Sequence, residues 1–173
     1  QFGDDDARIS ASVDSDGFIA FFSSFQSRAK ADLVLKNAGW TPETLFMERI
    51  SGRKTVLSRV AWDDDSNVST ESRVPEMDLG EVYPLTAQMR VNVLDPYSAV
   101  LRLIRHIETT GDCTESYEVF DGRRRNRLHF ETLGTTNLTE TRPGEFAGEA
   151  LICSIEFEPI GGHQIESKWR SDG

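Results

Sequence analysis

The sequence predicts a mainly β protein: a strongly curved antiparallel sheet or incomplete β-barrel, with one α-helix in a crossover and a short N-terminal helix. Three observations predict this fold. Apolar residues mostly recur at every second position, turn residues separate these segments at intervals of roughly eight to twelve residues, and a single segment has helical spacing. The length of 173 residues fits one domain over residues 1–173, with residues 1–7 as a mobile lead-in.

The N-terminal half reads as an antiparallel meander. Alternation is clearest from Gln26 to Leu35, where small and apolar residues face charged ones. Further strands are expected near residues 8–13, 41–47 and 56–62, and the acidic segment 63–67 is a turn. The dense aromatic segment 17–23 is expected to form the short buried N-terminal helix.

One helix follows an irregular segment at residues 72–82. Asp95 is a good N-cap and Pro96 suits the first turn. Apolar residues then recur at three- and four-residue steps, at Val100, Leu101, Ile104 and Ile107. Strands are expected afterwards over residues 117–120, 124–133, 146–158 and 163–169, with Pro159 to Gly162 joining the last two.

Charge and hydropathy exclude several classes of partner. The formal net charge of −10 opposes binding to nucleic acid or to an anionic membrane surface. No apolar run approaches the roughly 18 residues that cross a bilayer, so no membrane span is expected. The chain begins at Gln1 without an initiating Met, and we expect a processed form from which any export signal has been removed.

The two cysteines, Cys113 and Cys153, bear on the compartment. Their number alone is equally compatible with free thiols. Cys153 shares a strand face with Ile155 and Phe157, which predicts that it points toward the core, whereas Cys113 lies in a polar turn. Neither has a neighbouring histidine or a CxxC partner, so zinc and thioredoxin chemistry are disfavoured. The segment between them reads as a sheet pinned by one disulfide, in an oxidising compartment.

A basic cluster follows the turn signal Asp121-Gly122. On a strand, Arg123, Arg125 and Arg127 would point one way and Arg124 the other. Three guanidinium groups on one surface would make a candidate site for a phosphate, a carboxylate or an acidic partner. The competing interpretation is a hairpin arm whose arginines pair with the nearby glutamates.

The remaining chemistry-bearing residues point to no reaction. No pair among His106, His129 and His163 has metal-ligand spacing. Asp63-x-Asp65-x-Asn67 resembles the start of a calcium loop but lacks its later glycine and glutamate. No nucleophile or phosphate-binding motif is present, so no catalytic residue, metal or cofactor is expected. The ten phenylalanines suit either a closed core or a concave face that holds an apolar ligand.

Several motifs resemble the bacterial domain-of-unknown-function family 3108, and its alphaproteobacterial branch in particular. They cover most of the chain: Gly17 to Phe22, Leu94 to Ala99, Cys113, Glu118 to Leu128, Ala150 to Ile155, and Pro159 to His163. The resemblance implies an exported, periplasmic protein of Gram-negative bacteria, with a disulfide between Cys113 and Cys153 on a curved β scaffold. Members of that family start with a further glycine-bearing strand, which is not recognised in this sequence, so the resemblance leaves closure of the sheet open. It implies no established activity.

We therefore expect a non-enzymatic periplasmic cell-envelope protein that supports envelope integrity by binding a partner, which would be an envelope protein, glycan or lipid. The alternative is a carrier of a lipid or other apolar ligand in the concave face of the sheet. An unrecognised hydrolase is the third hypothesis.

Overall fold

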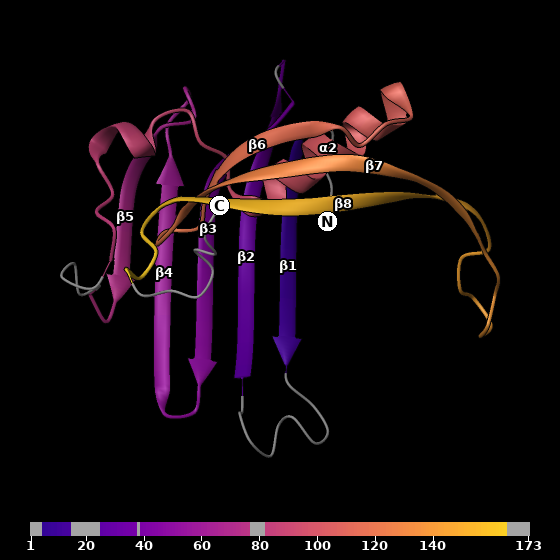
Figure 1. Cartoon of the computed structure of the whole chain (residues 1–173). Coiled ribbons are helices and arrows are strands. Elements are labelled where there is room, and N and C mark those ends of the chain that lie inside the picture. The colour runs from indigo at the N-terminus through magenta and orange to yellow at the C-terminus, as the bar shows by residue number, and fades with distance from the viewer. Residues whose placement is uncertain (1–4, 15–24, 38, 77–81, 166–173) are drawn as a thin grey trace.

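Two antiparallel sheets and a helix make up the fold (Figure 1). The computed structural model describes residues 5–14, 25–37, 39–76 and 82–165. The first sheet has the order β1-β2-β3-β4-β5 and the second the order β6-β7-β8. Their bounds are β1 (Asp6–Asp14), β2 (Phe25–Lys36), β3 (Gly39–Ser51), β4 (Lys54–Trp62), β5 (Val68–Val74), β6 (Glu115–Phe120), β7 (Arg125–Leu138) and β8 (Gly148–Gly161).

The antiparallel meander predicted for the N-terminal half is confirmed. In β2, the buried Ala29, Ala31 and Leu33 alternate with exposed Arg28 and Lys30, as the period-two pattern requires. The sheet also contains β5, within a region that the sequence left unassigned or irregular. The residues of β5 are almost all exposed because it is an edge strand, so it has no apolar alternation to reveal it.

The predicted helix, α2 (Pro96–Thr110), is also confirmed, but it connects β5 of the first sheet to β6 of the second instead of crossing over within one sheet. Asp95 caps it by accepting hydrogen bonds from the backbone N–H groups of Tyr97 and Ser98, at 2.8 and 3.2 Å. The predicted apolar stripe is wrong in part, because Val100 and Ile104 are each 46% exposed. The buried residues of α2 are instead Ser98, Ala99 and Leu103.

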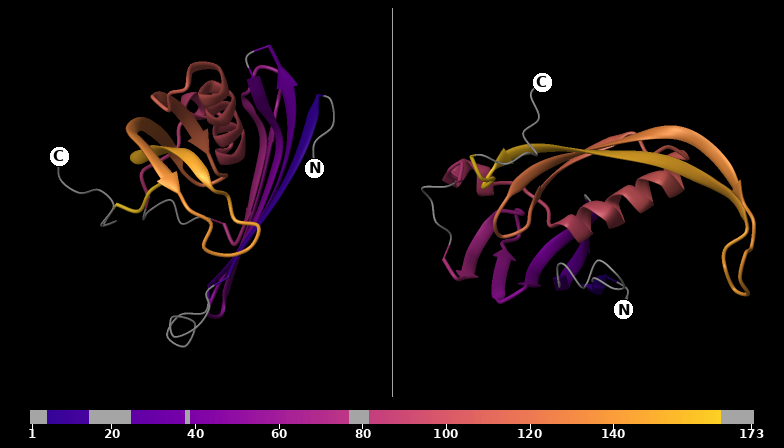
Figure 2. Two further views of the ribbon diagram at one scale, coloured as in Figure 1. Left: turned by 90° about the vertical axis from the view of Figure 1, so that its right-hand side faces the viewer. Right: turned by 60° about the horizontal axis from the view of Figure 1, so that its bottom comes forward.

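The helix lies between the two sheets (Figure 2, left) and contacts β3 and β6. This arrangement produces two apolar clusters. One lies against the first sheet around Leu33, Leu45 and Trp62, and the other lies between α2 and the second sheet around Leu103, Leu128 and Phe130. Adjacent residues of β6 divide between them: Phe120 packs in the first cluster and Val119 in the second. Strand β6 therefore joins the two cores.

The single sheet of the prediction is divided into two, and no closed barrel is formed among the described residues. Strand β8 is an edge of the second sheet, which changes the exposure of its apolar residues. Ile155 and Phe157, expected in the core, are 47% and 59% exposed, and Cys153 is exposed with them. The predicted face of β8 is correct, because Phe157 and Ile155 pair with the buried Leu128 and Phe130 of β7. Its predicted burial is wrong, because α2 contacts β6, at the opposite edge of the sheet.

Three further expectations concern the two ends of the chain, and the structure describes them only in part. The N-terminal helix expected at residues 17–23 lies outside the described residues. Strand β1 already begins at Asp6 and buries Ala7, so it includes the last two residues of the expected lead-in. Of the last expected strand, only His163 to Ile165 are described, and Gln164 there forms an isolated bridge to Val82.

Candidate functional site: two pockets beside the β6–β7 turn

A disulfide links Cys113, before β6, to Cys153 on β8, with the two Cα atoms 6.0 Å apart. This is the pairing that the family resemblance implied. Both cysteines of the chain are used, so no free thiol remains. Cys113 is fully buried while Cys153 lies at the exposed edge, so the bond ties the second sheet to the core beneath α2.

The Asp121-Gly122 turn lies between β6 and β7, as predicted. A single oxygen, Asp121 Oδ1, accepts hydrogen bonds from the backbone N–H groups of Arg123 and Arg124, at 2.8 and 2.6 Å. Gly122 has a φ of 82°, a conformation that favours glycine. The turn therefore fixes the backbone positions from which the side chains of Arg123 and Arg124 project.

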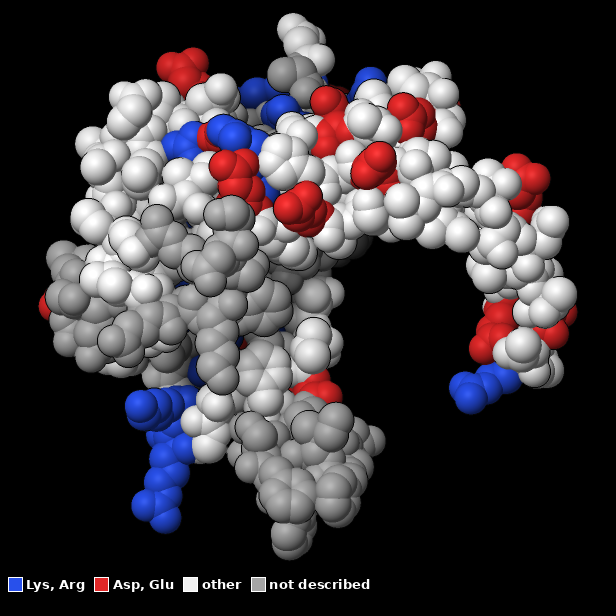
Figure 3. Space-filling view, in the orientation of Figure 1, with Lys and Arg blue, Asp and Glu red and all other residues white. Residues whose placement is uncertain are grey.

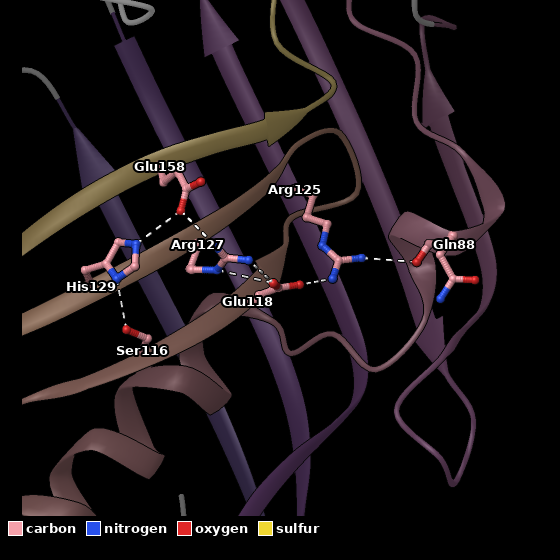
Figure 4. Close-up of polar contacts among 7 residues, drawn as sticks. All are labelled: Gln88, Ser116, Glu118, Arg125, Arg127, His129 and Glu158. Atoms are coloured by element: carbon pink, nitrogen blue, oxygen red, sulfur yellow. Dashed lines mark hydrogen bonds and ion pairs between the residues drawn. The ribbon is translucent and has the colours of Figure 1, made fainter. Parts of the chain in front are cut away.

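Arg125 and Arg127 are engaged in ion pairs on the outer face of the second sheet (Figure 4). Both bind Glu118, and Arg127 also contacts Glu158 at 2.9 Å. His129 extends the network, with its Nε2 3.1 Å from Glu158 and its Nδ1 2.9 Å from the hydroxyl of Ser116. The interpretation in which arginines pair with nearby glutamates is thus correct for these two residues.

The prediction that Arg123 shares their surface is wrong. Strand β7 begins only at Arg125, and its pairing with β8 is irregular between Arg125 and Asn126. The alternation of a strand therefore does not extend back to Arg123 in the turn. The side chain of Arg123 instead lines a pocket of about 80 Å³ that faces the first sheet. We call this the arginine pocket, and its lining residues are Met47, Arg49, Val56, Ser58, Arg73, Asp121 and Arg123.

Three guanidinium groups and one carboxylate line the arginine pocket, so its formal charge is three minus one, or +2. Within the described part of the chain, four of its nitrogens are buried without a hydrogen-bond partner: Nε of Arg49, Nε and Nη1 of Arg73, and Nε of Arg123. The carboxylate of Asp121 cannot balance three cations. Buried donors in folded proteins are nearly always hydrogen-bonded, so these nitrogens are places for ordered water, an ion or the anionic group of a ligand.

Burial and crowding of like charges both act on these arginines. Burial, followed by the charges of Arg124 and Arg73, lowers the pKa of Arg123 to about 10. The pKa of Arg73 is also lowered, first by burial and then by Arg49 and Arg124, although Asp121 opposes the shift. Both groups remain cationic at neutral pH, and a bound anion would relieve their repulsion.

A second pocket lies on the other side of the same turn. It has a volume of about 320 Å³, and we call it the apolar pocket. Its lining residues are Pro96, Val119, Asp121, Arg124, Asn126, Leu128, Phe157, Pro159 and His163. Asp121 lines both pockets, so the turn that orients Arg123 and Arg124 is shared by the two sites.

No metal centre is found among the described residues. The calcium-like segment is a closed turn in which Asp63 Oδ1 accepts hydrogen bonds from the backbone of Asp65 and Asn67, at 3.0 and 2.9 Å. The three histidines lie apart: His106 in α2, His129 in the outer ion-pair network and His163 beside the apolar pocket.

Sequence reasoning did not find Arg49 and Arg73. They lie on β3 and β5, which are distant from the turn in sequence, and each sits among residues that give no motif. Only the packing of the β6–β7 turn against the face of the first sheet brings them to Arg123. A weak signal existed in the excess of arginine near a turn, but it does not identify the partners.

The fold and pockets define a two-sheet, mainly β protein with one disulfide and adjacent cationic and apolar pockets. The chain belongs to the family described as protein of unknown function (DUF3108), whose model matches residues 1–168. Comparison with curated proteins and with solved structures gave no match. In the described residues, no helix is both long and apolar enough to span a bilayer.

Proposed function

We propose that the protein is a non-enzymatic, periplasmic cell-envelope protein that supports envelope integrity by holding an anionic group of an envelope partner in the arginine pocket. The pairing of both cysteines supports export to an oxidising compartment. The charges of Arg125 and Arg127 are already paired with Glu118 and Glu158, although Nε of Arg125 has no hydrogen-bond partner among the described residues, so this network is the less favourable place for a new anion.

One observation carries the proposal: Arg49, Arg73 and Arg123 converge from three separate segments on one small pocket with unpartnered nitrogens. Crowding three cations costs free energy in the unliganded protein, because their Coulomb repulsion acts in a partly desolvated site. A planar fork of guanidinium donors matches carboxylate and phosphate oxygens. At about 80 Å³ the pocket is suited to the anionic group of a larger partner and too small for a whole ligand.

Calorimetric titration tests the anion site. Inorganic phosphate, glucose 6-phosphate and glucuronate are added separately at low ionic strength, which distinguishes phosphate from carboxylate recognition. Arg73→Gln and Arg123→Gln should each weaken binding by roughly ten-fold or more, since each removes a charged hydrogen-bond donor. Arg127→Gln is the matched control: it removes the same charge from an arginine already paired with Glu118 and Glu158.

Two results would contradict the anion site: absence of saturable binding to all three probes, or equal weakening by Arg127→Gln. The envelope role is tested separately by co-purification from envelope extract, comparing the wild-type chain with Arg73→Gln. We expect the wild type and Arg127→Gln to retain a partner that Arg73→Gln loses. Recovery of the protein from the cytosolic fraction, with two titratable thiols, would overturn the location.

The apolar pocket favours a second candidate function, the carriage of a lipid or other apolar ligand. Its volume of about 320 Å³ lies at the lower end of known small-molecule pockets, and apolar residues of both α2 and the second sheet line it. Native mass spectrometry after gentle purification should show added ligand mass. A clean unliganded mass, together with no binding of added apolar ligands, would contradict this function.

A further inference from the structure

The apolar pocket has a hydrophobic wall and a separate polar end. Val119 and Leu128 form the base of the wall and are almost completely buried. Pro96, at the start of α2, and Pro159, near the end of β8, also line it. Phe157 belongs to the same lining, yet 59% of it is exposed. A ligand covering this ring would remove apolar surface from water, a favourable change of about 25 cal/mol per Å².

The polar end holds one guanidinium group, one carboxylate and an imidazole, from Arg124, Asp121 and His163, and it is incompletely hydrogen-bonded. Nε of Arg124 and Nε2 of His163 are buried and, within the described ranges, have no hydrogen-bond partner. Asp121 is the carboxylate at this end, and its Oδ1 is already occupied by two backbone N–H groups. Burial, followed by the charge of Arg124, lowers the pKa of His163, and the charge of Asp121 opposes this shift.

We infer that the apolar pocket is a binding site for an amphiphilic monocarboxylate, with the carboxylate at Arg124 and His163 and the apolar chain along Val119, Leu128 and Phe157. This inference deepens the second candidate function, on which it rests, and is independent of the arginine pocket. It assigns a ligand class to a site for which neither the sequence motifs nor the family description gives one.

A carboxylate fits this end better than a phosphate for two reasons. A single guanidinium group presents a fork that a carboxylate satisfies with two parallel hydrogen bonds. In addition, Asp121 lines the same pocket, and a dianionic head would be repelled by it more strongly than a monoanion. The adjacent arginine pocket, with three guanidinium groups, is the better site for higher charge.

Calorimetric titration with decanoate tests the site in the intact, disulfide-bonded chain. Decanoate should saturate at one molecule per chain, whereas acetate, which lacks the chain, and decanol, which lacks the head, should each bind at least ten-fold more weakly. Arg124→Gln should weaken decanoate by ten-fold or more and bring its affinity close to that of decanol. Phe157→Ser should weaken the binding of decanoate and of decanol by the same factor, because it removes apolar surface and leaves the polar end intact.

Arg123→Gln is the matched control, because Arg123 directly precedes Arg124 in the same turn but lines the arginine pocket. It should leave decanoate binding within two-fold of wild type while weakening phosphate or glucuronate, so failure of one site is distinguishable from failure of the other. Circular dichroism spectra should show that each variant is folded. Absence of saturable decanoate binding, equal affinity for decanol and decanoate, or tighter binding of decyl phosphate than of decanoate would overturn the inference.

Discussion

Arg123 and Arg124 are consecutive residues whose side chains line two different pockets. Asp121 fixes both by accepting their backbone N–H groups on one oxygen. The turn also lies directly against Gly162, which follows β8, because a Cβ on Gly162 would stand 1.9 Å from the carbonyl oxygen of Arg123. The β6–β7 turn thus positions both candidate sites, and its geometry depends on a residue that lines neither pocket.

The first prediction concerns this close approach. Gly162→Ala should destabilise the protein and displace the turn, because Gly162 has a φ of 74° and backbone atoms occupy the space of the new methyl group. Urea unfolding should show a loss well above the ~1 kcal/mol expected for a left-handed conformation alone. Binding of phosphate and of decanoate should weaken together, because the turn serves both pockets.

Gly111→Ala is the control for the backbone conformation. Gly111 has the same φ of 74°, at the C-terminus of α2, with no atom within 4 Å of the new Cβ. The free energy of unfolding of Gly111→Ala should fall by only about 1 kcal/mol, and this variant should still bind phosphate and decanoate. Equal effects of the two substitutions would show that the contact with Arg123 is unimportant.

The second prediction is a gain of affinity. Asp121→Asn keeps a side-chain oxygen that can accept the two backbone N–H groups of the turn, but it removes a negative charge from both pockets. Anions should therefore bind more tightly, with phosphate and decanoate affinities raised several-fold in calorimetric titrations at low salt. Asp121→Ala also removes the charge but loses the turn contacts, so it should not show this gain. Unchanged or weaker binding by Asp121→Asn would place the bound anions elsewhere.

Much of the fold was predictable because its signals are local. The alternation in β2 and the cap, proline and apolar spacing of α2 each lie within a short segment. Exposure depends instead on which element covers which face. Ile104 was misassigned because α2 directs Ser98, Ala99 and Leu103 into the fold, and Phe157 because β8 lies at an edge.

The candidate site was predictable only in part, for the same reason. The turn at Asp121 is a local signal, and it correctly predicted the bend of the chain that carries Arg123 and Arg124. Strand alternation could not separate Arg123 from Arg125, because the strand starts after Arg123. Arg49 and Arg73 contribute through tertiary packing between the two sheets, which leaves no period in the sequence.

The third prediction concerns the disulfide. Cys113 and Cys153 close a loop with a sequence separation of 40, so the chain-entropy model gives a stabilisation of about 4 kcal/mol. Addition of a reductant should lower the urea midpoint of the wild-type protein by a corresponding amount. The double variant Cys113→Ala, Cys153→Ala should unfold at this lower midpoint and be insensitive to reductant. Detection of two thiols in the unreduced, denatured wild type would contradict the pairing.

The fourth prediction concerns pH and the residue beside the disulfide. Asp112 Oδ1 accepts hydrogen bonds from the hydroxyl group of Thr132 and from the backbone and hydroxyl of Thr114, and these lower its pKa from 3.8 to about 2. A carboxyl whose pKa is lower in the folded state stabilises the protein above its unfolded pKa. That stabilisation is lost as the pH falls from about 4 to about 2.

Asp112→Asn should therefore reduce the free energy of unfolding relative to wild type at pH 6, and the difference should shrink at pH 2. Urea unfolding at both pH values measures it. Thr132→Val removes the hydrogen bond that lowers this pKa most, so an NMR titration of Asp112 in that variant should show its pKa moved back toward 3.8. Because the Thr132 hydroxyl also accepts the backbone N–H of Cys113 at 2.8 Å, this variant should lose further stability that does not depend on pH between 2 and 6. A difference between Asp112→Asn and wild type that stays constant from pH 6 to pH 2 would show that the charge of Asp112 is not coupled to folding.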